Sequence, residues 1–269
     1  MQYSLLPPRP RDSHKGQFGW VGVVGGAPGT VGAALLAGRS ALKSGAGRVT
    51  VGLLDERVTV DFTRPELMFA APEKLVEDAQ LSVMALGPGL GQGEHALALL
   101  KKALALPCPL VLDADGLNLL ASHGEVKDTL VRRSLPTLLT PHPGEAARLL
   151  GCSVAEVQAD RSAAARRIAE SFRAWTVLKG AGSVIAQPDG SFSVNSSGCP
   201  AMAAAGMGDV LTGLIAGLIA QGLEPGPALE AGVYLHGAAG ERVWKENGHP
   251  PSISASDLID SISAGLGTS

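Results

Sequence analysis

Two glycines and an aspartate stand immediately before an apolar stretch in the segment AAAGMGDVLTGLIAG, residues 203–217. Glycine removes the Cβ barrier to close approach of another group, and the first amides of a helix have no partners within it. If a helix begins here, its unpaired N–H groups form an anion site that the glycines leave open. We therefore predict a phosphate site at this loop.

Asp209 is the unusual member of this loop. A bound phosphate would repel a carboxylate beside it, a cost that is tolerable if Asp209 acts on a neutral neighbour, for example by accepting the proton of a hydroxyl. The arrangement then indicates phosphoryl transfer to an alcohol. The alternative is that Asp209 only caps the helix, as aspartates often do in α/β proteins, and the spacing alone favours neither interpretation.

Glycines and carboxylates also follow the other predicted strands. The loops are GGAPGTVGAA (25–34), GPGLG (87–91), DADGLN (113–118), TPHPGE (140–145) and KGAGS (179–183). Because ligands of open α/β sheets bind beyond the carboxyl ends of the strands, these loops and GMGD predict one long crevice. We interpret Asp113 and Asp115 as turn residues at a strand end.

Two common nucleotide motifs fit this sequence poorly. The first loop, with Asp55 at the end of the next strand, could be a dinucleotide-binding fingerprint, but its glycines are not spaced G-x-G-x-x-G. GMGD lacks the lysine and the spacing of a Walker A motif.

Short β-branched runs alternate with alanine- and leucine-rich segments, which is the pattern of βαβ units around a mainly parallel sheet. We predict an α/β fold of three αβα layers in a single domain, residues 1–269. The predicted strands cover 20–26, 48–54, 81–87, 109–115, 136–141 and 175–180, followed by an antiparallel hairpin over 183–195. The predicted helices cover 32–44, 93–105, 116–121, 144–150, 160–173, 209–221, 226–246 and 254–265.

Two details of the C-terminal helices can also be predicted. Ser254 and Asp257 have the spacing of a capping box at the start of the last helix. Gly213 and Gly217 are expected to allow close helix packing and to touch no ligand.

The composition limits the classes of partner. The 269 residues are 45% hydrophobic and 17% charged, enough to bury a substantial core. A net charge of −3 and 4% aromatic residues argue against nucleic acid. The apolar run 210–220 is about half the ~20 residues of a membrane span. Three scattered cysteines indicate reduced thiols, so we expect a cytoplasmic protein.

Seven motifs in order resemble those of the NAD(P)H-hydrate dehydratases, a branch of the ribokinase-like superfamily, over essentially the whole chain. They are HKGQFG, RPELM, GPGLG, LDADGLNLL, LTPHPGEAARLLG, VLKGAGSVI and AMAAAGMGDVLTGLIAG. The resemblance implies a ribokinase-like fold and repair of damaged nicotinamide cofactor. Hydrated NADH or NADPH would be dehydrated at the expense of ADP in bacterial members, or ATP in eukaryotic ones, with AMP or ADP and phosphate released. It also implies a homo-oligomer, a tetramer or larger.

The resemblance carries roles to the matching positions of this chain. The adenine nucleotide would be held by Lys179, Gly180, Ala181, Gly182, Ser183 and Gly208. The hydrated cofactor would be touched by Ala33, Gly89, His142 and Asp209. Glu145 matches an acid that positions Mg²⁺ through water. Asp209 would deprotonate the ring hydroxyl, while the amides of Gly206, Met207 and Gly208 would stabilise the phosphoryl group.

Several of these positions have simpler interpretations. His142 could satisfy a loop carbonyl, and Lys179 could be a solvated lysine at a strand end. Ala205 departs from the family pattern, as do Cys199 and Ala201. The rival functions are a kinase of a small alcohol such as a vitamin precursor, and a non-catalytic nucleotide-binding protein. Asp209 argues against the second, because a pure binder gains nothing from an acid near phosphate.

Overall fold

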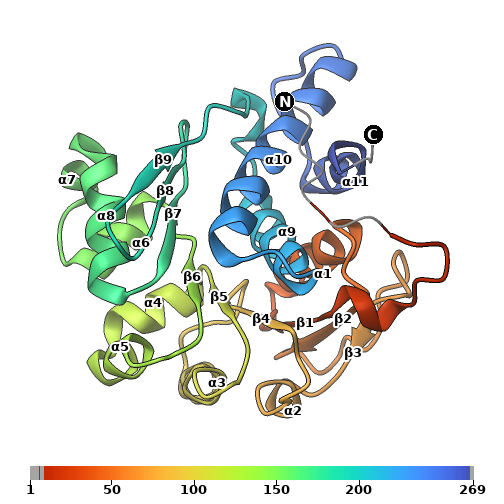
Figure 1. The fold of residues 1–269 in the computed structure, drawn as a ribbon, viewed down its shortest axis with the longest axis horizontal. Helices are drawn as coiled ribbons and strands as arrows, with labels where there is room; N and C mark the ends of the chain where they lie inside the picture. Colours follow the sequence, from red (N-terminus) through yellow and green to blue (C-terminus); the bar gives the residue numbers. More distant parts are fainter. Residues whose placement is uncertain (1–5, 7–8, 267–269) are drawn as a thin grey trace.

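The computed structural model describes residue 6 and residues 9–266. Their strands form one nine-stranded sheet in the order β3-β2-β1-β4-β5-β6-β7-β8-β9 (Figure 1). The strands are β1 (Trp20–Gly25), β2 (Arg48–Leu53), β3 (Met68–Phe69), β4 (Val83–Leu86), β5 (Leu110–Leu112), β6 (Thr137–Leu139), β7 (Trp175–Leu178), β8 (Val184–Ala186) and β9 (Phe192–Val194). The strands β1 to β7 pair in parallel, while β8 and β9 add the predicted antiparallel hairpin.

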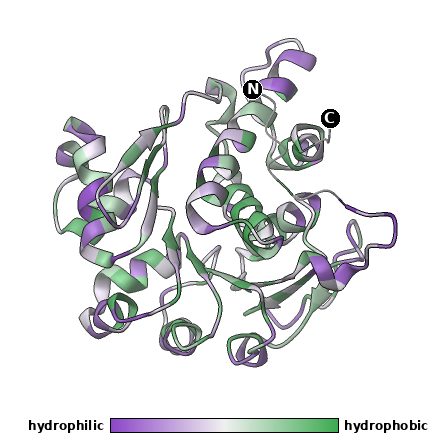
Figure 2. Ribbon diagram, in the orientation of Figure 1, coloured by the Kyte–Doolittle hydropathy of each residue, from purple (hydrophilic) through white to green (hydrophobic). Residues whose placement is uncertain are grey.

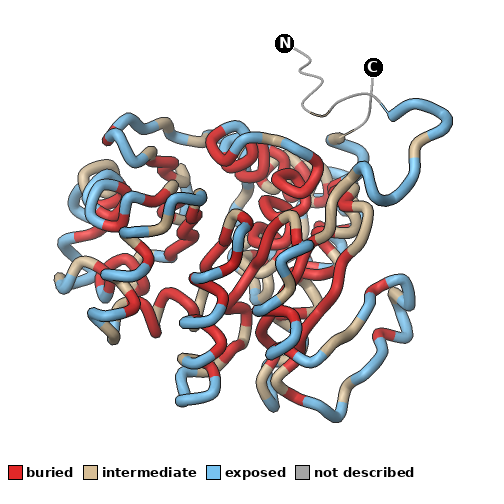
Figure 3. The backbone as a smooth tube through the Cα atoms, turned by 60° about the horizontal axis from the view of Figure 1, so that its bottom comes forward, coloured by how far each residue is buried: buried red, intermediate tan, exposed pale blue. Residues whose placement is uncertain are grey.

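Helices cover both faces of this sheet, so the predicted three-layer α/β architecture is confirmed (Figure 1). In β1, Val21 and Val23 belong to one core while Val24 belongs to the other, because successive side chains point to opposite faces. Strands buried on both faces read as continuous apolar runs, which is why WVGVVG contains no polar residue. In Figure 3 the central strands are accordingly shown in red as buried.

One helical layer contains α1, α9, α10 and α11, which share a core with one face of the sheet. Their bounds are α1 (Val31–Lys43), α9 (Met207–Ala220), α10 (Pro225–Glu246) and α11 (Ala255–Gly265). A Cβ atom at Gly213 would lie 1.9 Å from the carbonyl oxygen of Ala37 in α1, and one at Gly217 would lie 1.9 Å from Ser44 Oγ. The predicted close packing of this helix is thus confirmed, as is the capping box of Ser254 with Asp257.

The other layer covers the opposite face. It contains α2 (Pro72–Leu75), α3 (Glu94–Ala103), α4 (Asp115–Ser122), α5 (Gly124–Val131), α6 (Pro143–Leu150), α7 (Val154–Ala159) and α8 (Arg161–Phe172). Several short elements lie outside those predicted: α2, α5, α7, the two-residue β3 and two 3-10 turns, η1 (Lys15–Phe18) and η2 (Pro200–Met202). Most of these span six residues or fewer, too short for a periodic apolar pattern to stand out.

The strand order reverses between β1 and β4, and the loops that follow these strands meet at that point. Gly26 N donates to Pro88 O at 2.9 Å, and Ala27 N donates to Gly89 O at 2.7 Å. Such a switch point is where open α/β sheets bind ligands. The glycine is required at 89, where φ is +61° and a Cβ atom would lie 2.6 Å from Thr30 O.

The helix α9 is apolar over most of its length and appears green in Figure 2. It is nevertheless only 14 residues long. None of the described helices combines the length and the apolar character needed to cross a bilayer.

Candidate active site

The anion loop, residues 206–209, lies at the start of α9. Gly206 is the N-cap residue with φ +85°, and no side chain caps this helix. A Cβ atom at Gly206 would lie 2.6 Å from Leu36 Cδ1, so both the backbone and the packing require glycine. Asp209 is the third residue inside the helix, so the interpretation of Asp209 as the N-cap is wrong. The first amides of α9 are left without a capping side chain, as an anion site needs.

Lys179, directly after β7, lies beside this loop. Its ammonium is 2.6 Å from Asp113 Oδ1 and 3.9 Å from Glu145 Oε2. The Lys179 side chain is only 18% exposed, so the interpretation of Lys179 as a solvated lysine is wrong. Burial alone would lower the pKa of Lys179, but the charges of Asp113 and Glu145 outweigh burial and raise it. Lys179 is therefore a fixed positive charge.

Gly208 and Lys179, both assigned to the nucleotide by resemblance, are brought together. A Cβ atom at Gly208 would lie 3.2 Å from Lys179 Nζ and 3.8 Å from Asp113 Oδ2. The ammonium thus lies close to the backbone of the anion loop, and a side chain at position 208 would have to displace the end of the Lys179 side chain slightly. Amides and an ammonium at one place can stabilise the charge of a phosphoryl group.

Asp113 is the centre of this polar network. Its Oδ1 accepts from Lys179, and its Oδ2 accepts from Thr212 Oγ1 at 2.8 Å. The next residue, Ala114, has φ +49° and ψ −116°, a strained conformation for a residue with a Cβ atom. The turn interpretation of Asp113 therefore understated its place in the site. Two sequence features indicate this role: Asp113 is an acid at the end of a buried strand, and Thr212 is a polar residue in an apolar run, three positions after Asp209.

The surroundings of Asp209 raise the pKa of its carboxyl to about 7. Burial is the largest cause; the negative charges of Asp113 and Glu145 add to it, and Lys179 opposes them. Within the described part of the chain, no residue donates a hydrogen bond to this carboxylate, and Lys179 acts on it through its charge alone. A carboxyl with a pKa near neutrality can both accept and release a proton at physiological pH, as a general base requires.

His142 and Glu145 form the start of α6. His142 Nδ1 accepts from Gly144 N at 2.9 Å, and Glu145 Oε2 accepts from His142 N at 2.7 Å, which completes a capping box. The ring nitrogen accepts from amides, so the interpretation that His142 satisfies a loop carbonyl is wrong. Burial first, and then the charges of Lys179 and Arg148, lower the pKa of His142. Burial raises the pKa of Glu145.

Ala33, in the first turn of α1, and Gly89, in the loop after β4, lie beside the switch point. Thr30 connects them, since Ala33 N donates to Thr30 O at 3.1 Å and Thr30 Oγ1 donates to Gly89 O at 2.9 Å. Nearby, Asp115 Oδ2 accepts from Gly91 N at 2.9 Å. These residues are separated from Lys179 by the strands β5 and β6.

The loop of Lys179, Gly180, Ala181, Gly182 and Ser183 joins β7 to β8. Gly180 and Gly182 have φ values of +145° and +65°. Ser183 Oγ donates to Gly180 O at 3.0 Å, and Arg161 of α8 donates to the carbonyls of Leu178 and Ala181. The loop therefore has a fixed backbone, in which Gly180 leaves room for the Arg161 guanidinium and a Cβ atom at Gly182 would meet nothing closer than 3.7 Å.

The structure bears on metal and dinucleotide binding as well. Among residue 6 and residues 9–266, no group of three or more His, Cys, Asp or Glu side chains is arranged to hold a metal ion. Side chains without a preformed set of metal ligands suit an ion that is bound mainly by the phosphates of a substrate, with one carboxylate acting through water. Asp55, the acid of a possible dinucleotide fingerprint, is paired with Arg57 at 2.7 Å.

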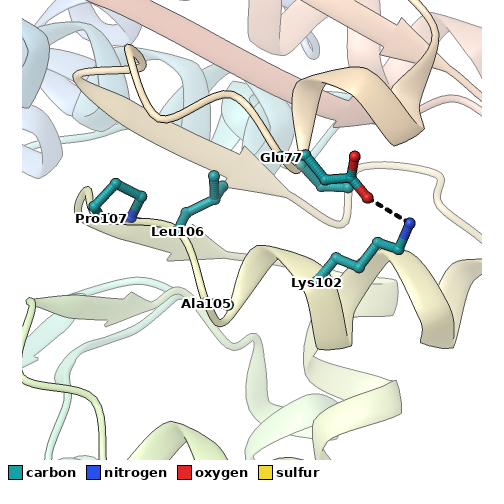
Figure 4. A pocket seen from close by; sticks show the side chains of 6 residues that line it. Glu77, Lys102, Ala105, Leu106 and Pro107 are labelled. Atoms are coloured by element: carbon teal, nitrogen blue, oxygen red, sulfur yellow. Dashed lines mark hydrogen bonds and ion pairs between the residues drawn. The ribbon is translucent and has the colours of Figure 1, made fainter.

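A shallow hollow of about 260 Å³ lies elsewhere, near residues 105–107 between α3 and β5 (Figure 4). Glu77 and Lys102 form an ion pair of 2.6 Å across it. It lies at the amino-terminal edge of the parallel strands, opposite the glycine-rich loops, and is no part of the candidate site.

Comparison with known proteins agrees with this geometry. The family model described as NAD(P)H-hydrate dehydratase matches residues 21–264. The chain belongs to the NAD(P)H-hydrate dehydratase family. It is 42% identical to the ADP-dependent (S)-NAD(P)H-hydrate dehydratase of Neisseria meningitidis over 93% of this chain and 86% of that protein. It is 45% identical to the bifunctional NAD(P)H-hydrate repair enzyme of Moorella thermoacetica, of which it spans only 51%.

A solved structure of this family superposes closely. The ADP/ATP-dependent NAD(P)H-hydrate dehydratase from Bacillus subtilis, co-crystallised with ATP and Mg²⁺, matches with a TM-score of 0.83 and 35% identity, over 97% of this chain and 93% of that one. A hydroxyethylthiazole kinase from Pyrococcus horikoshii, at 15% identity and a TM-score of 0.67, shares the fold. The predicted ribokinase-like fold is thereby confirmed.

Proposed function

We propose that this chain dehydrates (S)-NADH hydrate and NADPH hydrate to NADH and NADPH, coupled to conversion of ADP into AMP and phosphate. The observation that carries the proposal is Asp209, a carboxyl with a pKa near 7 beside an uncapped glycine loop and a fixed ammonium. Family membership supports the reaction, and the names of the Neisseria and Bacillus relatives support ADP as co-substrate.

The chemistry follows from the poor leaving ability of hydroxide. Asp209 takes the proton of the ring hydroxyl as the hydroxyl oxygen attacks the terminal phosphorus of ADP. The bond between that phosphorus and the oxygen bridging the two phosphates breaks, and AMP is released. The ring nitrogen then donates its electron pair, the C–O bond breaks, and phosphate leaves with the former hydroxyl oxygen. The adjacent carbon loses a proton, which restores the dihydropyridine ring.

The roles of the remaining residues follow from their surroundings. The amides of Gly206, Met207 and Gly208 and the ammonium of Lys179 stabilise charge on the phosphoryl group in transfer. Asp113 holds Lys179 in place and, with Glu145, keeps the pKa of Asp209 high. In this proposal the loop of Lys179 to Ser183 binds ADP, while Ala33, Gly89 and His142 contact the hydrated cofactor.

The proposal includes Mg²⁺ bound chiefly by the phosphates of ADP. Glu145 is the residue that would hold it, through water, because its own carboxylate oxygens already face His142. The ion would supply positive charge to the phosphates. The crystals of the Bacillus relative were grown with ATP and Mg²⁺, which supports this part.

We also propose that the protein is cytoplasmic and self-associates into a tetramer or larger. The three cysteines, all within the described residues, are unpaired, which suits a reducing compartment. Self-association rests on the family resemblance, and light scattering on the purified protein measures it.

The proposal is tested by measuring the ratio in which NADH, AMP and phosphate are formed. Protein, Mg²⁺, ADP and hydrated NADH are mixed, and NADH absorbance, AMP and phosphate are followed together. All three should form in equal amounts, and ADP hydrolysis without hydrate should be slow because no acceptor is positioned. A stable phosphorylated alcohol as the end product would instead indicate a kinase. ADP binding with no product would indicate a non-catalytic binder.

A further inference from the structure

Helix α10 runs beside the segment that leads from β9 to the anion loop. A Cβ atom at Gly240 would lie 2.3 Å from Met202 Sδ, so the helix needs glycine to approach this segment. Glu241 Oε1 accepts from Gly198 N at 2.8 Å. The helix thus fixes the backbone that precedes the anion loop, and one of its side chains reaches the loop itself.

That side chain is His236. Its Nε2 lies 2.9 Å from the carbonyl oxygen of Met207, the first residue of α9. Because a carbonyl oxygen only accepts, Nε2 must carry the proton. Burial lowers the pKa of His236 to about 4, with the charge of Lys179 adding to the shift, so the ring is neutral at physiological pH. His236 is therefore a neutral donor within electrostatic reach of the site.

The peptide group that His236 contacts also carries an amide of the anion loop. The carbonyl of Met207 and the N–H of Gly208 belong to one planar unit, so a bond that fixes the oxygen also fixes the direction of the N–H. A hydrogen bond to the oxygen polarises the whole amide, which makes its N–H a stronger donor. Gly208 is the residue whose backbone lies against Lys179 Nζ.

We propose that His236 is a positioning residue for phosphoryl transfer: its hydrogen bond to Met207 O orients and strengthens the Gly208 N–H that binds the phosphate of the nucleotide. His236 itself touches no substrate. The inference rests on the proposed function, because it assigns the phosphate of ADP to the anion loop.

Two substitutions separate the hydrogen bond from simple packing. His236→Leu fills the same space without a donor, and His236→Gln returns an N–H at about the position of Nε2. A matched control is His123, whose Nδ1 lies 3.0 Å from Leu119 O at the far end of α4. His123→Leu removes the same kind of contact at a distance from the anion loop.

The measurements are ADP affinity by calorimetry in Mg²⁺, hydrate turnover and the melting temperature of each variant. His236→Leu should weaken ADP binding and lower kcat/KM by roughly tenfold, the factor of one hydrogen bond of ordinary strength. His236→Gln and His123→Leu should keep values close to those of the parent. If the leucine variant does not fold, His236→Asn, whose amide is one bond too short, should show the same weakening.

Two results would overturn the inference. One is a folded His236→Leu that binds ADP and turns over like the parent. The other is a His236→Gln as impaired as His236→Leu, since the donor would then not be what matters. If the parent binds ADP but forms no NADH, the proposed function fails while the comparison of ADP affinities still decides the role of His236.

Discussion

Two aspartates in this site differ in what compensates their charge. Asp113 accepts hydrogen bonds from Lys179 and Thr212, so its charge is compensated inside the protein. Asp209 is partly buried beside it, and the pKa of Asp209 rises to about 7. The first carboxylate serves as a fixed anchor and the second can exchange a proton.

Asp209→Asn should lower activity and raise stability at the same time. The variant loses the proton acceptor, so turnover should fall by about 10²–10⁴-fold, while ADP should bind as well as before or better because the repulsion is relieved. The folded pKa of Asp209 exceeds its ordinary value of 3.8, so the parent loses stability as pH rises from about 4 to 7. The asparagine variant has no carboxyl to ionise and avoids this loss of folding stability. The loss is at most about 4 kcal/mol, and it is smaller where water reaches the carboxylate.

Three measurements on one preparation check this prediction: turnover, calorimetric titration of ADP, and urea unfolding at pH 5 and pH 8. The stability difference between variant and parent should be larger at pH 8. A variant that unfolds like the parent at both pH values and keeps most of its turnover would remove Asp209 from the mechanism.

The pH dependence of the parent should follow the same carboxyl. Asp209 must be ionised to accept a proton, so kcat/KM should rise with pH and level off above a midpoint near 7, the pKa of the free enzyme. Below the midpoint the slope should be about tenfold per pH unit. An initial-rate profile between pH 5 and 9 measures this, and a flat profile across that range would show that a different group is the base.

At the scale of elements, the two glycines of the anion loop should respond differently to alanine. Gly206 has φ +85°, and a Cβ atom there would clash with Leu36, so Gly206→Ala should cost about 1–3 kcal/mol of stability. Gly208 lacks a left-handed backbone and faces the end of a flexible lysine, so Gly208→Ala should fold nearly as well. If the phosphate binds at this loop as proposed, the added Cβ atom would obstruct its approach, so ADP affinity should drop.

Unfolding and ADP titration of both variants test this contrast. Gly93→Ala is the control, because a Cβ atom at Gly93 meets nothing within 4 Å. Equal ADP affinity for the parent and a folded Gly208→Ala would mean that the phosphate binds elsewhere.

Much of the element order could be predicted from sequence, because buried parallel strands such as WVGVVG carry an unmistakable apolar pattern. The loops after those strands could be assigned to one edge of the sheet for the same reason. The side-chain contacts at that edge could not be predicted from the sequence. Nothing local in the sequence shows that Lys179 pairs with Asp113, 66 positions away, or that His236 reaches Met207. Such contacts depend on the packing of whole elements.

At the scale of the whole molecule, the two proposed binding regions follow different strands along the same edge of the sheet. Ala33 and Gly89 lie at the switch point between β1 and β4, and the loop after Lys179 follows β7. Asp209 lies in the first turn of α9, within electrostatic reach of Lys179. In the proposed function, ADP at the loop after Lys179 and the hydrated cofactor at Ala33 and Gly89 would meet at Asp209, which is the arrangement that direct phosphoryl transfer requires.

The fate of the ring oxygen tests this account most directly. Hydrated NADH is prepared with ¹⁸O in its ring hydroxyl and turned over with ADP and Mg²⁺, and the released phosphate is analysed by mass spectrometry. If the hydroxyl is phosphorylated and then expelled, the label must appear in phosphate, one ¹⁸O for each NADH formed. Label recovered in water, with unlabelled phosphate, would show that ADP hydrolysis and dehydration are separate events and would contradict the account.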